Sequence, residues 1–93
     1  MTYLESLQNA VQQAHSCTAK HLESVPVREM FRGKIVWDGT VEVFSLKGHP
    51  KAKRAYAWGY PDQGELTITT VLGLPPIRSA LDAVRASIAG APE

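Results

Sequence analysis

Apolar side chains near the N-terminus recur at intervals of three and four residues, which is the period of an amphipathic helix. They are Leu4, Leu7, Val11, Ala14 and Leu22, and Thr18 falls at the same spacing. Thr2 and Glu5 have the spacing of a capping box at the start of such a helix. Pro26 disfavours the helical region for Val25, the residue before it. The pattern therefore predicts one helix over residues 2–24.

The hydrophobic period changes to two over residues 34–46, where Ile35, Trp37, Val41 and Val43 share one parity and Lys34, Asp38, Thr40 and Glu42 share the other. This alternation is typical of a strand with one buried face. The Asp38-Gly39 pair is also a strong signal for a two-residue hairpin turn. Such a turn would place Ile35 and Trp37 on the same face as Thr40 and Glu42. We therefore favour a single strand, in which Gly39 is a candidate β-bulge.

Two further strands and a second helix are predicted in the remainder of the chain. After a turn over 47–51, residues 52–60 alternate small residues with arginine and aromatic ones, and residues 65–72 are rich in β-branched residues. A four-residue turn over 61–64 joins these two strands. Apolar residues recur at helical spacing over 79–89, where Ser79 and Asp82 give a weaker capping box. Residues 91–93 are expected to form a frayed tail.

The predicted fold class is therefore α+β, in the order α-β-β-β-α. It consists of a three-stranded antiparallel meander with two helices, which we expect to pack on one face of the sheet. With Tyr60 and Glu65 closing the four-residue turn, Trp58 lies opposite Thr67 and Tyr56 opposite Thr69. One face then carries several small side chains, which allow a helix to pack closely. Its residues are Ala55, Ala57, Gly59, Leu66, Ile68 and Leu72.

If both helices cover that face, an aromatic row on the other face is open to a partner. The predicted partner or ligand surface consists of Phe44, Tyr56, Trp58, Tyr60, Thr67 and Thr69. A contiguous surface of this kind favours a homodimer formed sheet to sheet, or a ligand bound on the sheet. A loop one residue shorter would instead place the aromatic side chains in the core. The sequence leaves both alternatives open.

Composition limits the classes of function. The 93 residues suffice for one domain, which we predict to span 1–93. Ten basic and nine acidic side chains nearly cancel, so the overall field does not favour nucleic acid or an anionic membrane. The single cysteine, Cys17, excludes an intramolecular disulfide framework, and the N-terminal residues lack the pattern of a signal peptide. No apolar run approaches the ~20 residues of a membrane span. We expect a cytoplasmic protein.

The basic residues concentrate at one predicted turn. Lys47, His49, Lys51, Lys53 and Arg54 form a candidate anion-binding site, and the aromatic residues that follow could stack on the bases of RNA. Lysines that flank strands also deter edge pairing, and we favour this reading of a solvated turn. The alternative function is accordingly the binding of RNA or another polyanion.

Catalytic and metal-binding signals are weak. An imidazole such as that of His49 could act as an acid or base. Between Gly48 and Pro50, however, His49 is better explained as a residue that fixes the turn by hydrogen bonds. Cys17 and His21 have the spacing of two metal ligands on one helix face, which falls short of a complete site. We predict no catalytic residues, no metal and no cofactor.

The Gly48-His49-Pro50 turn and the Ala55-Tyr56-Ala57-Trp58 strand resemble those of a family of small uncharacterised bacterial proteins. Further residues that carry the likeness are Trp37, Gly39, Val41, Val43, Phe44, Leu46, Ala52, Pro75, Pro76 and Ser79. The resemblance implies a bacterial, cytosolic, single-domain protein, and it supplies no functional residues. Together these observations predict a non-enzymatic binding or interaction module that dimerises or binds a partner through its sheet. A small enzyme using His49 is the third choice.

Overall fold

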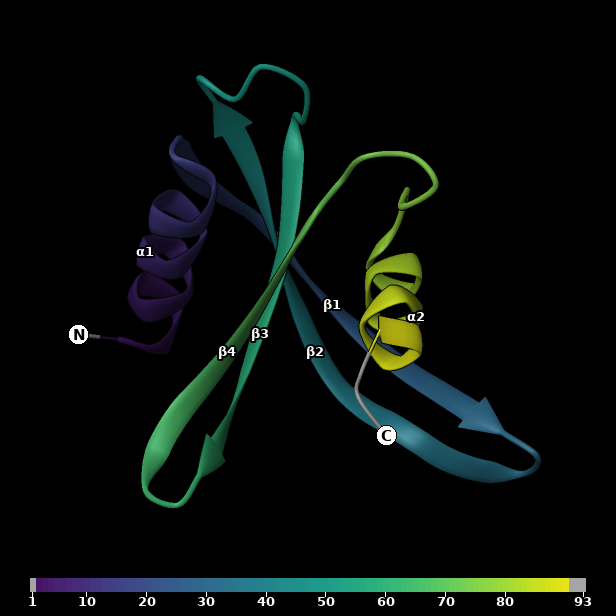
Figure 1. Ribbon diagram of the computed structural model, residues 1–93. Helices are drawn as coiled ribbons and strands as arrows, with labels where there is room; N and C mark the ends of the chain where they lie inside the picture. The colour runs from purple at the N-terminus through teal and green to yellow at the C-terminus, as the bar shows by residue number, and fades with distance from the viewer. Residues whose placement is uncertain (1, 91–93) are drawn as a thin grey trace.

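A computed structural model describes residues 2–90 and shows a four-stranded antiparallel sheet with two helices (Figure 1). The elements are α1 (Tyr3–His15), β1 (Thr18–Phe31), β2 (Lys34–Lys47), β3 (Arg54–Asp62), β4 (Glu65–Leu72) and α2 (Ala80–Gly90). The strands lie in the sheet in chain order. The predicted α+β class and antiparallel sheet are confirmed, but the prediction of three strands was wrong. The predicted tail, 91–93, lies outside the described residues.

The additional strand, β1, occupies part of the predicted N-terminal helix. Thr2 and Glu5 form the expected capping box at the start of α1. The helix ends early because Ser16 adopts the left-handed conformation, with φ 51°, and donates its N–H to the carbonyl of Gln12. The register of β1 against β2 then skips Leu22, a β-bulge that interrupts the alternation of a strand. Residues 18–22 therefore belong to a strand, although their apolar positions have the spacing of a helix.

Pro26 lies inside β1 and does not end a helix. The N–H of Leu46 donates to the carbonyl of Lys53 of the neighbouring segment. Since the backbone groups of successive strand residues point to opposite edges, the even-numbered residues in this part of β2 bond toward β3 and the odd-numbered residues bond toward β1. Val41 pairs with Val25, and the same alternation turns the peptide nitrogen of Pro26 to the outer edge of the sheet. A proline at that edge removes no hydrogen bond from the ladder.

α1 covers the start of this outer edge. The N–H of Ala19 donates to Oε1 of Gln12 at 3.1 Å, and Nε2 of Gln8 donates to the carbonyl of Ala19 at 2.6 Å. Two glutamine side chains of the helix thereby take the place of a neighbouring strand. They satisfy peptide groups that would otherwise invite pairing with another chain.

β2 is one continuous strand, as predicted, and has no turn at Asp38-Gly39. Gly39 pairs with Val27 in regular register, so the predicted bulge at Gly39 was wrong. The irregularity lies nearer the end of the hairpin. Trp37 and Ile35 have successive partners on β1, which leaves Val36 as the extra residue.

The β3–β4 turn has two residues rather than four. Gln63 and Gly64 both have positive φ, 52° and 82°, as in the tight turns that join twisted antiparallel strands. Asp62 therefore pairs with Glu65, and Trp58 lies opposite Thr69 rather than the predicted Thr67. Because the register differs from the prediction by an even number of residues, the division of side chains between the two faces is unchanged.

The two helices cover opposite faces of the sheet, so the prediction that both pack on one face was wrong. α1 packs on the small-residue face, where the buried cluster is Leu7, Val11, Ala19, Phe44, Ala55 and Ala57. α2 packs on the aromatic face, where the buried cluster is Val27, Val41, Val43, Tyr56, Trp58, Ala80, Ala83 and Val84. In Figure 1 the helices flank the point at which the two hairpins cross.

The pairing of β2 with β3 is short, and this shapes the molecule. The ladder joins Glu42–Ser45 of β2 to Arg54–Ala57 of β3, with one further hydrogen bond from Leu46 to Lys53, and the two strands diverge beyond Glu42 and Ala57. The β1–β2 hairpin continues beyond the ladder as a two-stranded arm, defined here as residues 28–38, and Figure 1 shows it projecting past α2. Its turn is formed by Arg32 and Gly33, both with positive φ.

Candidate functional site

The predicted aromatic partner surface is largely buried. Phe44 lies under α1, and Tyr56 and Trp58 lie under α2, with only 4 % of each of these two residues exposed. These three side chains belong to the core, which is the alternative that the sequence left open. Tyr60 is 51 % exposed. The remaining predicted residues, Thr67 and Thr69, are half-buried on β4.

The basic turn is organised by His49, as the sequence predicted. Its Nδ1 accepts the backbone N–H of Lys51 at 3.1 Å and that of Ala52 at 2.8 Å. These two donors are therefore not available to an anion. The predicted cations Lys47, Lys51, Lys53 and Arg54 are exposed around the turn.

A second imidazole lies near this turn. Nε2 of His15 is 3.1 Å from the hydroxyl of Thr70. Burial, and to a smaller extent the charge of His49, hold the pKa of His15 below its ordinary value. The neutral form of His15 is thereby favoured in the folded protein.

His21 and Cys17 do not share a helix face, because the chain here has left α1 and entered β1. Nε2 of His21 lies 2.9 Å from Oε1 of Glu42, a carboxylate whose residue is only 6 % exposed, and the hydroxyl of Ser24 donates to the same oxygen. The carboxylate thus separates the hydroxyl from the imidazole, so no nucleophile–base pair is formed. Among residues 2–90, no three histidine, cysteine or carboxylate side chains are placed to hold a metal.

An apolar surface that the sequence did not predict lies on the arm. Its exposed side chains are Met30, Phe31, Ile35 and Val36. Together with Ile88 of α2, part of this surface lines an open hollow of about 500 Å³, and Glu29 and Arg85 form an ion pair across the rim. The sequence does contain a signal for this surface, namely apolar residues on both sides of Arg32-Gly33. That pattern indicates the end of a hairpin only if β1 is recognised as a strand.

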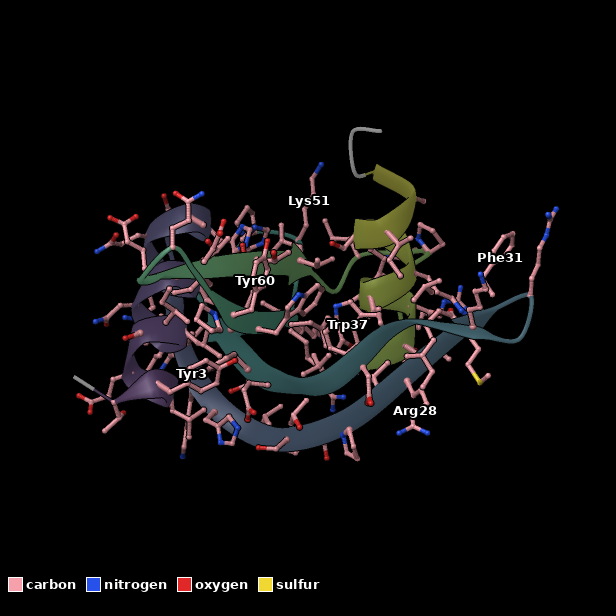
Figure 2. The ribbon with its side chains drawn as sticks, turned by 90° about the horizontal axis from the view of Figure 1, so that it is seen from below. Tyr3, Arg28, Phe31, Trp37, Lys51 and Tyr60 are labelled. Atoms are coloured by element: carbon pink, nitrogen blue, oxygen red, sulfur yellow. The ribbon has the colours of Figure 1, made fainter. Side chains whose placement is uncertain are left out.

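A second opening lies where β2 and β3 diverge, and we call it the aromatic cleft. It has a volume of about 380 Å³ and is lined by Tyr3, Trp37 and Tyr60, with Trp58 at its inner side. The rings of Trp37 and Trp58 meet edge to face, with centroids 5.5 Å apart. Figure 2, seen from below, shows Tyr3, Tyr60 and Trp37 around this part of the molecule.

Tyr3 closes the β2–β3 ladder at the inner end of the aromatic cleft. Because Glu42 pairs with Ala57, a continued register would place Thr40 opposite Gly59. The N–H of Gly59 instead donates to the hydroxyl of Tyr3 at 2.8 Å, and this hydroxyl donates to the carbonyl of Gly59 at 3.3 Å. Gly59 also lacks the Cβ that would lie 3.3 Å from the ring of Tyr3.

Comparison with protein-family models, with curated proteins and with solved structures found no significant match. The likeness to small bacterial proteins therefore stays a prediction. None of the helices within 2–90 combines the length and hydrophobicity required to cross a bilayer.

Proposed function

We propose that this protein is a non-enzymatic interaction module that forms a homodimer through its β1–β2 arm. The observation that carries the proposal is the set of exposed apolar side chains at the end of the arm, Met30, Phe31, Ile35 and Val36. Soluble monomers rarely expose a contiguous apolar patch larger than a few hundred Å². Here the four side chains lie at the end of a projecting hairpin, with Met30 and Ile35 on the opposite face from Phe31.

The charges of the arm favour a second copy over a strongly charged partner. Glu29 pairs with Arg85, and Arg28 pairs with Asp38 at 3.3 Å, so much of the charge on the arm is balanced within the chain. An apolar centre with a balanced polar rim is the usual anatomy of a protein–protein interface. The other charged residues of the arm are Arg32, whose guanidinium lies over the ring of Phe31, and Lys34.

The alternative of RNA or another polyanion at the basic turn is weaker for a geometric reason. His49 already takes the N–H groups of Lys51 and Ala52, which leaves the exposed cations as the main source of attraction. As part of the same proposal we place the protein in the cytoplasm, where the thiol of Cys17 would stay reduced.

Sedimentation equilibrium of the wild type and of Phe31→Asp tests the proposal. We expect the wild type to dimerise in the micromolar range and Phe31→Asp to weaken the dimer at least about 30-fold, as loss of an interface anchor does. Leu22→Asp is the matched control, because Leu22 is an exposed apolar residue of β1 outside the arm. Circular dichroism shows whether each variant is folded.

A wild type that remains monomeric at several hundred micromolar would refute the dimer. If that monomer bound an RNA oligonucleotide at low salt, and neutralising Lys51, Lys53 and Arg54 abolished the binding, the polyanion alternative would replace it.

A further inference from the structure

We infer that the two arms of the dimer lie antiparallel and that the Phe31 ring of each copy enters the aromatic cleft of the other. This inference rests on the proposed homodimer and specifies its geometry. It assigns a ligand to the aromatic cleft, namely an aromatic side chain carried on a β-hairpin.

Phe31 has the position required of an inserting group. It is 61 % exposed and lies next to the hairpin turn, and Figure 2 shows it at the far end of the arm. The guanidinium of Arg32 lies over its ring, 5.1 Å from the centroid. Pairing of Phe31 with Lys34 holds its backbone at the end of the ladder.

The aromatic cleft has the properties of a receptor for such a ring. Tyr3, Trp37 and Tyr60 provide ring faces and edges around an opening of about 380 Å³. Aromatic rings attract one another in edge-to-face and offset arrangements, beyond the gain from burying their area. Gly39 and Gly59 keep side chains out of the opening, because a Cβ on Gly39 would lie 3.1 Å from the ring of Trp37.

The ring and the cleft lie on one chain but cannot meet within it. Trp37 pairs with Glu29, two residues from Phe31, so their Cα atoms lie only roughly 8–9 Å apart. Phe31 nevertheless belongs to β1, and β2 lies between it and the opening between β2 and β3. The paired strands prevent the end of the arm from folding back onto its base. A second copy in the opposite orientation brings each Phe31 to the other base, and a twofold axis then makes two equivalent contacts.

The charges of β2 agree with this alignment. If the twofold axis passes near Val36, then Lys34 of each copy lies beside Asp38 of the other, because each is two positions from Val36. Opposite charges placed across strands stabilise a pairing, and like charges destabilise it. Lys34 forms no ion pair with any residue in the described range. Asp38 pairs with Arg28 of its own chain at 3.3 Å, and both Lys34 and Asp38 are exposed.

Disulfide trapping tests the alignment independently of dimerisation. In a Cys17→Ser background, chains carrying Lys34→Cys are mixed with chains carrying Asp38→Cys under glutathione oxidation. We expect the mixed disulfide to form at least about tenfold faster than in a control mixture of Lys20→Cys with Asp38→Cys, because proximity in the dimer raises the effective concentration. Lys20 is exposed at the opposite end of β1.

A complementation experiment tests the insertion itself. Phe31→Ala removes the ring and Tyr60→Ala opens the aromatic cleft, so each variant alone should dimerise at least about tenfold more weakly than the wild type. A mixture retains one intact contact, between Phe31 of one chain and the cleft of the other. We therefore expect mixed dimers to be tighter than either variant homodimer.

The outcomes separate the two proposals. A monomeric wild type would overturn the proposed function and this inference with it. A dimeric wild type whose Lys34 and Asp38 cysteines are trapped no faster than the control would overturn the alignment alone. Mixed dimers no tighter than the variant homodimers would overturn insertion of Phe31 into the cleft.

Discussion

Replacing Tyr3 by phenylalanine removes one oxygen atom and tests how the β2–β3 ladder is terminated. The hydroxyl accepts the N–H of Gly59 at 2.8 Å and donates to the carbonyl of the same residue at 3.3 Å. In Tyr3→Phe both peptide groups lose their partner, while the ring can keep its packing against Gly59. The variant therefore isolates the hydrogen bonds from the hydrophobic contact.

The size of the effect follows from the burial of the site. A buried peptide group left without a partner costs about 1–3 kcal/mol, and an ordinary hydrogen bond contributes about 1 kcal/mol. Tyr3 is 43 % exposed, so water can reach part of the vacated position. We therefore expect a loss of about 1–2 kcal/mol for the two bonds together. With a urea m-value of about 1–1.5 kcal/mol/M, the midpoint should fall by roughly 1 M.

Urea unfolding followed by circular dichroism measures this loss at a fixed protein concentration. Concentrations low enough to keep the chain monomeric separate folding from association. Tyr60→Phe is the matched control, because Tyr60 is exposed on the same hairpin and should change stability by less than about 0.5 kcal/mol. If Tyr3→Phe unfolds at the same urea concentration as Tyr60→Phe, the hydroxyl does not stabilise the end of the ladder.

Two further predictions concern the histidines. The pKa of His15 is lowered in the folded protein, mainly by burial, so below about pH 6.5 the unfolded chain binds the proton more readily. The stability that depends on neutral His15 is therefore fully present above that pH and is lost as the pH falls through the folded pKa. The urea midpoint of the wild type should drop more between pH 7.5 and 5 than that of His15→Gln. Equal drops in the two proteins would contradict this prediction. His49→Ala removes the acceptor of two backbone N–H groups and should cost about 1–2 kcal/mol in urea unfolding, whereas His49→Asn, which keeps an acceptor, should recover part of the loss. No recovery would show that another property of His49 fixes the turn.

The sequence predicted the elements whose local signals agree with their tertiary environment. The Thr2–Glu5 capping box, the unbroken alternation of β2 and the turn fixed by His49 were all readable, because each depends on residues close together in the chain. The small-residue face around Ala55 and Ala57 was also identified correctly as a place where a helix packs.

β1 was missed because its sequence hides the period of a strand. The bulge at Leu22 shifts the alternation, and Pro26 is ordinarily a reason to reject a strand. Pro26 is tolerated only because its nitrogen faces the outer edge, which depends on the register against β2. A pairing across the chain decides this, and no local pattern contains it.

The facing of Tyr56 and Trp58 was undecided for a related reason. Their strand alternates cleanly, so the residues that share a face were predictable, but the position of α2 was not. Once the N-terminal helix is shortened and β1 joins the sheet, a wider sheet has two faces to cover. One helix then packs on each, and the aromatic row becomes core.

The arm and the aromatic cleft have one structural origin. Both exist because β2 and β3 separate beyond Glu42 and Ala57. There the hydroxyl of Tyr3 bonds the peptide groups of Gly59 that would otherwise pair with Thr40. A longer β2–β3 ladder would cover part of β2 with β3 and would fill the space between them. The surface that we propose for dimerisation is thus held open by a residue of α1. For this reason Tyr3→Phe should weaken the dimer as well as the fold. His49→Ala acts at the opposite end of the ladder, so it should lower stability and leave the dimer dissociation constant of the folded protein unchanged.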